Sequence, residues 1–164
     1  MDDKRISIKE LRQQQARHWP EMHCASNPAI LNIVRAGDRF IKETNAALQI
    51  YQLTGAEFDV LATLRRQEQP YQLSPTELCK AMLFSSGGLT KVLYRLQNAR
   101  LILRPENPND GRSLLVQLSP EGITLTGKLC ATIAALHEKR IAKLSSAEQA
   151  TLSQLLEKAF ADEN

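Results

Sequence analysis

The sequence predicts a mainly α-helical protein with one small β-hairpin. Ser or Thr is followed by Glu three residues later at three places, the pattern of a capping box, in which each side chain satisfies an amide of the other residue. These pairs are Thr54 and Glu57, Ser74 and Glu77, and Ser145 and Glu148. Apolar residues with helical spacing follow these caps, whereas residues 101–104 and 114–118 read as strands around a turn. We therefore expect about six helices and one hairpin.

The helices are expected at residues 28–52, 54–67, 74–82, 85–99, 120–143 and 146–161. Pro75 and Pro120 each follow a serine, at the first helical position, where proline is well tolerated. Helix 28–52 carries an apolar stripe of Ile30, Ile33, Val34, Ile41 and Leu48. The last two helices carry Ile123, Leu129, Ile133 and Leu136, and Leu152, Leu155, Leu156 and Phe160. Because no sheet is available to cover these stripes, they are expected to pack against each other or a second subunit.

Helix 85–99 has two different faces. Leu89, Val92, Leu93 and Leu96 follow the i, i+3, i+4, i+7 rule of an amphipathic helix. The opposite face carries Ser86, Gly87, Thr90, Lys91, Tyr94 and Arg95. The short helix 74–82 precedes it, and the hairpin follows with Asn109, Asp110 and Gly111 in its turn. This order is a helix-turn-helix with a β-wing, which places one helix in the major groove of DNA.

Charge is concentrated in the same region. Residues 91–112 hold five basic and two acidic side chains, so this segment carries the same net charge, +3, as the whole chain at pH 7. Such a concentration is typical of a surface that contacts phosphates, although a solvated helix face can also be basic. The candidate DNA contacts are Ser85, Ser86, Gly88, Thr90, Lys91, Arg95, Asp110 and Arg112.

These candidates have different expected roles. Arg112 at the tip of the hairpin suits a narrow, negative minor groove, with Asp110 orienting it. The alternative is that Arg112 and Asp110 only form a solvent-exposed ion pair. Lys91 or Arg95 can contact a phosphate or read a guanine, and the sequence does not distinguish them. Gly87 and Gly88 cost about 1 kcal/mol each relative to alanine in a helix, which a close approach to phosphates would offset.

The sequence gives little support for other classes of protein. The sequence holds no nucleophile elbow, phosphate-binding loop or zinc-protease motif, so we expect neither an enzyme nor a cofactor. No apolar run approaches the roughly 20 residues that span a bilayer, and the polar N-terminus lacks a signal-peptide core, so a cytoplasmic protein without membrane contact is expected. His18, His23 and Cys24 form too loose a cluster for structural zinc, and we expect no metal. Cys79 and Cys130 are expected to be small core residues.

With these residues in place, the chain resembles the MarR family of winged-helix transcriptional regulators from about residue 28 to the end. The most specific element is the wing, in which Asp110-Gly111-Arg112-Ser113 leads into Leu118-Ser119-Pro120-Glu121-Gly122. The resemblance implies a homodimer on a pseudo-palindromic DNA operator, with residues 28–52 and 120–164 forming the dimer and residues 53–119 binding DNA. It also implies a small anionic aromatic effector that releases the DNA.

The run 57–66, followed by Pro70-Tyr71 and Ser74-Pro75, is similar to the urate-responsive PecS and HucR group within that family. This implies an extra helix within residues 1–27 and a ligand pocket of Trp19, Asp59 and Arg104. Trp19 can also be a packing anchor, and Asp59 can simply favour the start of its helix. The group's recognition-helix arginine falls on Val92 here, and its helix-closing glycine falls on Arg100.

We therefore expect a homodimeric transcriptional regulator, a repressor released from its operator by urate or an aromatic acid. Two alternatives stay open. One is an oxidant-responsive regulator of the same fold that senses through Cys24. The other is a winged-helix protein–protein interaction module, which a small and basic recognition face disfavours.

Overall fold

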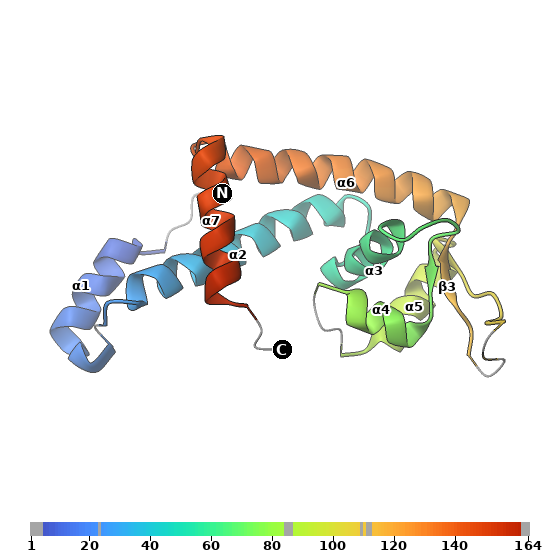
Figure 1. The fold of residues 1–164 in the computed structure, drawn as a ribbon, viewed down its shortest axis with the longest axis horizontal. Helices are drawn as coiled ribbons and strands as arrows, with labels where there is room; N and C mark the ends of the chain where they lie inside the picture. The colour runs from blue at the N-terminus through green and yellow to red at the C-terminus, as the bar shows by residue number, and fades with distance from the viewer. Residues whose placement is uncertain (1–4, 23, 84–86, 109, 111–112, 162–164) are drawn as a thin grey trace. The chain divides into compact units, whose positions relative to one another are not determined.

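The computed structural model describes residues 5–22, 24–83, 87–108, 110 and 113–161 (Figure 1). The elements of the described chain are α1 (Ile8–His18), a 3-10 turn (Pro20–Met22), α2 (Asn27–Gln49), α3 (Gly55–Arg65), β1 (Gln72–Leu73), α4 (Pro75–Ala81), α5 (Leu89–Asn98), β2 (Ile102–Leu103), β3 (Val116–Leu118), α6 (Pro120–Ile141) and α7 (Ser146–Ala159). The expected fold class, mainly α with a winged helix-turn-helix, is confirmed. No described helix is both long and apolar enough to cross a membrane.

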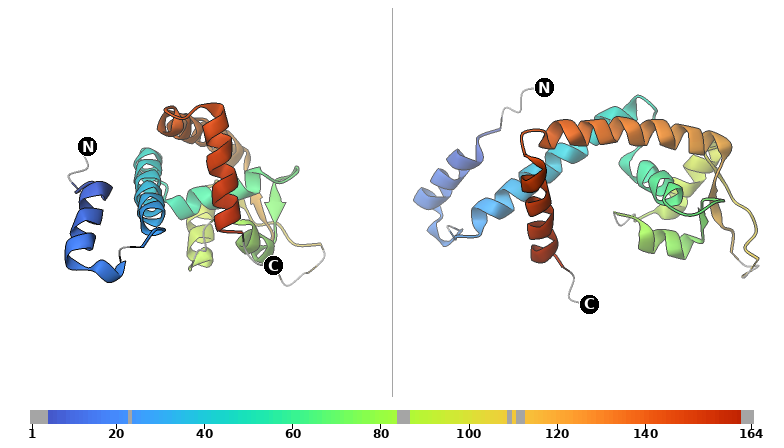
Figure 2. Two further views of the ribbon diagram at one scale, coloured as in Figure 1. Left: turned by 60° about the vertical axis from the view of Figure 1, so that its left-hand side comes forward. Right: turned by 45° about the horizontal axis from the view of Figure 1, so that its top comes forward.

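The chain divides into two compact units, Met1–Glu43 and Thr44–Asn164, with the boundary inside α2. The N-terminal unit holds α1, the 3-10 turn and most of α2. The second unit holds the end of α2 together with all later elements, so the two C-terminal helices group with the helix-turn-helix. The right-hand view in Figure 2 shows α6 leaving the end of β3 as one continuous helix.

The helix starts predicted from capping boxes are confirmed. At α3 the backbone N–H of Thr54 donates to Glu57 Oε2 over 2.7 Å, and the N–H of Glu57 donates back to the Thr54 hydroxyl. Ser74 and Ser145 form the same reciprocal pairs at α4 and α7. Ser119 caps α6 by accepting the N–H of Gly122 over 2.9 Å. Each cap satisfies amides that a helix start otherwise leaves free.

Three short strands form one antiparallel sheet in the order β1-β3-β2. The wing strands pair Ile102 with Leu118, and a bridge between Glu106 and Leu114 extends the same register. The sequence pattern missed β1, because two residues are too few for an alternating pattern to be visible.

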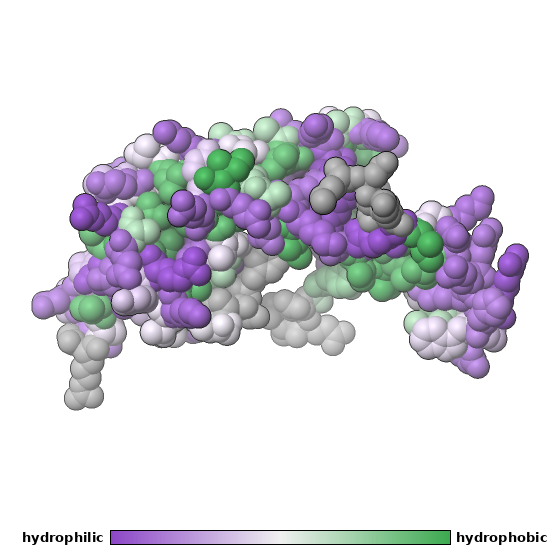
Figure 3. All heavy atoms as spheres, turned by 180° about the vertical axis from the view of Figure 1, so that it is seen from behind, coloured by the Kyte–Doolittle hydropathy of each residue, from purple (hydrophilic) through white to green (hydrophobic). Residues whose placement is uncertain are grey.

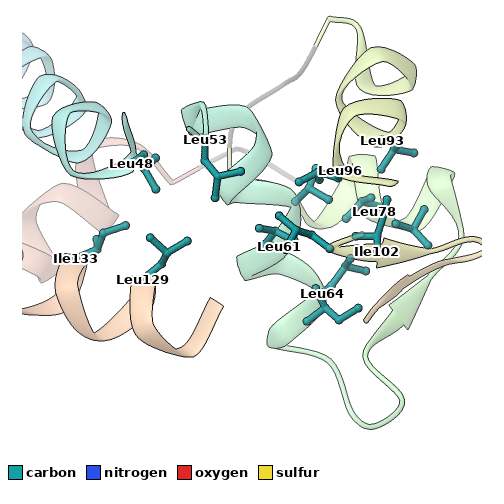
Figure 4. Packing of buried hydrophobic residues seen from close by; sticks show 14 residues of the cluster. Leu48, Leu53, Leu61, Leu64, Leu78, Leu93, Leu96, Ile102, Leu129 and Ile133 are labelled. Carbon is teal, nitrogen blue, oxygen red and sulfur yellow. The ribbon is translucent and has the colours of Figure 1, made fainter. Parts of the chain in front are cut away.

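The core lies in the second unit and runs from the end of α2 and from α6 into the helix-turn-helix (Figure 4). At one end, Leu48 of α2 faces Leu129 and Ile133 of α6. At the other, the wing and the three short helices contribute Leu61, Leu64, Leu78, Leu93, Leu96 and Ile102. This cluster fixes α5 and the wing on one scaffold.

Two helices end in the same way, with a non-glycine residue in the left-handed region. Gln52 after α2 has φ of 56° and Arg100 after α5 has φ of 59°. In the second case, Arg100 N–H donates to the Gln97 carbonyl and Leu101 N–H to the Leu96 carbonyl. These two hydrogen bonds form a Schellman motif, whose left-handed residue is usually glycine.

Two cysteine predictions are wrong. Cys79 in α4 and Cys130 in α6 are exposed, not buried in the core. Each directly follows a fully buried leucine, Leu78 or Leu129. Because successive helical residues are about 100° apart around the axis, a residue next to the centre of a buried stripe turns toward solvent.

Several predicted apolar stripes remain uncovered within one chain. Ile30, Ile33, Val34 and Ile41 of α2 are exposed, as are Leu152, Leu155 and Leu156 of α7 and its C-cap Phe160. Figure 3 shows apolar atoms reaching the surface between hydrophilic ones on one face of the molecule.

Candidate nucleic-acid interface

The helix expected to read DNA begins later than predicted, at Leu89 instead of residue 85. Gly88 is its N-cap and has φ of 110°, a backbone conformation that L side chains rarely adopt. This left-handed conformation of Gly88 stops the helix from starting earlier. Gly87 and Gly88 are exposed, and a Cβ at either would meet nothing within 4 Å, so the backbone there is open to a close neighbour. Ser85 and Ser86 lie outside the described residues.

The outer face of α5 is solvent-exposed as expected. Thr90 and Lys91 are exposed, and Tyr94 is 66% exposed. The inner face places Leu93 and Leu96 in the core. The face left for a partner is thus polar, and Tyr94 places an aromatic ring on it.

Arg95 occupies a different environment from Lys91. Its Nε lies 2.9 Å from Oε1 of Glu57, whose side chain is only 4% exposed, while the Arg95 side chain is 51% exposed. The pair joins α5 to the first turn of α3. Glu57 was recognised in the sequence as a capping residue, but nothing local indicated its second partner, which lies on another helix.

The turn between α4 and α5 is held from α3. Oδ1 of Asp59, a residue only 5% exposed, accepts the backbone N–H of Leu83 over 3.3 Å. Arg66 donates to the carbonyl of Ala81 over 2.9 Å, at the last residue of α4. Sequence reasoning missed Arg66, since its acceptor is a backbone oxygen. The geometry of the helix-turn-helix therefore depends on polar side chains of α3 and its C-terminal end.

The wing is an ordered turn on its described residues. Asn107 and Ser113 face each other, with Asn107 N–H donating to the Ser113 carbonyl and Asn107 Nδ2 donating to the Ser113 hydroxyl, both over 3.3 Å. The N–H of Ser113 donates to the Asp110 carbonyl over 3.0 Å. Asp110 is exposed. Arg112, the predicted minor-groove residue, lies outside the described residues.

Arg104 lies at the base of the wing, directly after β2. Its Nη2 donates to the Leu114 carbonyl over 3.1 Å, whereas its Nε is buried and has no acceptor among the described residues. Partial burial lowers the pKa of the guanidinium from its ordinary value. A buried donor of this kind is a candidate site for an anion.

The remaining predicted residues lie in the N-terminal unit. Trp19 ends α1 and is 55% exposed. Cys24 is exposed, and the hydrogen bond of its Sγ with the Ser26 hydroxyl, at 3.4 Å, lowers the pKa of the thiol. The structure brings no three His, Cys, Asp or Glu side chains together as a metal site within its described part; His23 of the loose cluster is outside it.

Known proteins share this arrangement. A family model described as MarR family matches residues 51–113, from the end of α2 through the wing. The multiple antibiotic resistance protein MarR of Escherichia coli is 34% identical over 124 residues, which cover 75% of this chain and 82% of MarR. The chain belongs to the MarR family. The HTH-type transcriptional regulator PecS of Dickeya dadantii is 29% identical over 124 residues, covering 76% of this chain and 75% of PecS.

Solved MarR-family structures agree with the fold. A mutant of E. coli MarR bound to operator DNA superposes with a TM-score of 0.68 at 30% identity, covering 84% of this chain and 99% of that one. BpsR of Bordetella bronchiseptica, whose DNA binding is regulated by 6-hydroxynicotinic acid, gives a TM-score of 0.73 at 26% identity, covering 86% and 98%. The predicted resemblance is confirmed, and the chain is a MarR-family transcriptional regulator that binds DNA.

Proposed function

We propose that this MarR-family protein is a homodimeric repressor that leaves its operator when a small anionic aromatic ligand binds. The observation that carries the ligand response is the buried Nε of Arg104, which lacks an acceptor among the described residues. An anionic ring substituent would accept this N–H, and charge-assisted bonds of this kind are strong where water is excluded. The DNA-binding relative BpsR responds to 6-hydroxynicotinic acid, a ligand of this chemical class.

The dimer is supported by the uncovered apolar faces of α2 and α7. Exposed Val34 and Leu155 are typical of these two faces. Contiguous apolar surface on a soluble domain usually marks an interface, and most oligomers are symmetric homodimers. Two winged helices in such a dimer would present two α5 helices to successive major grooves, about 34 Å apart on a pseudo-palindromic operator.

On the DNA, we assign the major-groove face to Ser85, Ser86, Gly88, Thr90 and Lys91, and the minor groove to Arg112 with Asp110. The exposed backbone at Gly88 and the exposed side chains of Thr90 and Lys91 support this assignment. The same hairpin would then contact DNA at its tip and the effector at its base, near Arg104. Asp59 belongs to the same unit as Arg104 and is the second candidate ligand residue in this proposal, while the ligand role of Trp19 stays a prediction from the sequence.

The test is a gel-shift titration of a duplex from the region upstream of the gene, with and without urate and hydroxylated aromatic acids. The wild type should bind and then release the duplex as ligand is added. Arg104→Gln should keep the DNA affinity but lose the response to ligand, because the anion then has no charged donor. Lys143→Gln, in the turn after α6, removes one exposed charge elsewhere and should respond as the wild type does. Ligand response that survives Arg104→Gln would contradict the assignment.

Cys24 supports a second candidate function, an oxidant response. Its thiol is exposed and has a lowered pKa through its bond with Ser26, both of which favour the reactive thiolate. In that case peroxide, and no aromatic acid, would release the duplex, and Cys24→Ser would abolish the effect. A protein–protein module would instead be supported by a binding constant that does not fall as salt rises.

A further inference from the structure

Glu57 is a nearly buried carboxylate with both oxygens engaged. Oε2 accepts from the N–H and the hydroxyl of Thr54, over 2.7 Å and 2.8 Å. Oε1 accepts from Nε of Arg95 over 2.9 Å. The cap therefore uses one oxygen, and the other oxygen is committed to the helix that faces DNA.

The two oxygens of Glu57 differ in whether a hydrogen-bond donor remains when Arg95 moves away. Oε2 keeps its local partner because Thr54 belongs to the same helix start. Oε1 has only Arg95 among the described contacts, and at 4% exposure the Glu57 side chain has little access to water. Withdrawing Arg95 toward a phosphate would thus leave a buried, charged oxygen unpaired, which is strongly unfavourable. The pair is expected to persist when α5 meets DNA.

The position of the pair determines what it can control. The core contacts of α5 come from Leu93 and Leu96, and apolar contacts are not directional, so they tolerate a roll of the helix about its axis. The Arg95–Glu57 bond is directional and lies one helical turn from Lys91. It therefore sets the angle at which Lys91 faces outward.

We propose that Arg95 is a positioning residue that acts through Glu57 to fix the rotation of α5, and that Lys91 supplies the cationic major-groove contact of this helix. This inference rests on the DNA-binding function and separates two residues with the same charge on the same helix face.

The experiment is a double-mutant cycle on the full chain, with Glu57→Gln, Arg95→Gln and the double variant. Affinity for the upstream duplex is measured by fluorescence anisotropy over a range of salt concentrations. Each single variant should bind on the order of tenfold more weakly, and the double variant no more weakly than either single one, because both changes break the same pair. The slope of log K against log salt should not change, since no phosphate contact is lost.

Lys91→Gln provides the contrast. It should weaken binding more in the wild-type background than in the Glu57→Gln background, because Lys91 is already misplaced once the pair is broken. If Lys91 contacts a phosphate, the salt slope falls by about 0.9; if it reads a base, the preference for the operator over random duplex falls instead. Lys139→Gln, an exposed charge on α6, should leave affinity and slope at their wild-type values.

Three results would overturn the inference: wild-type affinity in Arg95→Gln, a salt slope reduced by about one in that variant, or an Arg95→Gln loss that persists in the Glu57→Gln background. Circular dichroism checks that each variant folds. If Glu57→Gln does not fold, Arg95→Lys replaces it as the test of the pair. Lysine keeps the charge but has no Nε donor, so it should bind as weakly as Arg95→Gln, whereas wild-type affinity would refute the positioning role. A wild type that binds no duplex would count against the DNA-binding function instead.

Discussion

At the scale of single residues, Arg100 is a position where the backbone conformation is unfavourable for the residue that occupies it. The left-handed conformation that closes α5 carries a penalty of about 1–2 kcal/mol for a residue with a Cβ. The two bonds of the Schellman motif and the burial of Leu101 hold this conformation. Gln52 after α2 is in the same situation, with Leu53 buried beside it.

Arg100→Gly should therefore raise the free energy of unfolding, by about 0.5–1 kcal/mol after the greater flexibility of glycine in the unfolded chain is included. Urea denaturation followed by circular dichroism measures it. Asn98→Gly, at a helical position two residues earlier, is the matched control and should destabilise by about 0.5–1 kcal/mol. A decrease in stability for Arg100→Gly would show that its side chain contributes more than the backbone costs.

Gly122 is the opposite case, a glycine that close packing requires. A Cβ there would lie 2.0 Å from the Leu101 carbonyl oxygen, so the backbone would have to move. Gly122→Ala should destabilise by about 1–3 kcal/mol, the usual range for overpacking. Gly127→Ala in the same helix meets nothing within 4 Å and should stabilise by about 1 kcal/mol. Thermal unfolding of the two variants separates the effect of packing from that of helix propensity. Equal changes in melting temperature for both variants would contradict this explanation.

At the scale of elements, the capping boxes couple helix starts to pH. The side-chain and backbone hydrogen bonds of Ser74 lower the pKa of Glu77, and those of Ser145 lower the pKa of Glu148. Because the folded pKa lies below the unfolded value of about 4.3, each contribution is fully present above that value and is lost as pH falls through the folded pKa.

Ser74→Ala should cost about 1 kcal/mol at neutral pH, the usual value for an N-cap serine. The difference in unfolding free energy between wild type and variant should shrink as pH falls below about 4, since the wild-type cap then weakens as well. Denaturation at pH 7 and pH 3 tests this. Thr76→Ala, an exposed first-turn position that is not the cap, should show no such pH-dependent difference.

The helix starts were predictable because their signals lie within four residues. Thr54 and Glu57 satisfy each other whatever the rest of the chain does, and Ser119 caps α6 in the same way. The start of α5 was predicted wrongly because the left-handed conformation of Gly88 is visible only in three dimensions. The bond from Arg95 to Glu57 was missed for a related reason: helical periodicity says which face a residue occupies, but not which residue of another helix it meets.

At the scale of the whole molecule, the apolar faces of α2 and α7 predict a dimer. Leu155→Glu would place a charge among apolar side chains of such an interface, where burying it without a partner is costly. The variant should sediment as a monomer at micromolar concentration and lose most of its operator affinity, because each half-site then binds alone. Gln154→Glu, the adjacent exposed position on α7, is the control and should remain dimeric. A Leu155→Glu protein that still sediments with the wild type would exclude α7 from the interface.

The junction between α5 and α6 has a consequence for local unfolding. The carbonyl of Arg100 accepts the Ser119 hydroxyl over 2.6 Å, and the carbonyl of Leu101 accepts the Ser119 N–H over 3.1 Å. The start of the long helix α6 is therefore hydrogen-bonded to the two residues that follow the end of α5. Neither helix end can fray there without breaking these bonds. In hydrogen exchange, the amides of Leu101, Ser119 and Gly122 should open together and at one free energy, as members of a single cooperative unit. Any motion that tilts α6 would then reach α5, the helix proposed to read DNA, without an intervening flexible joint.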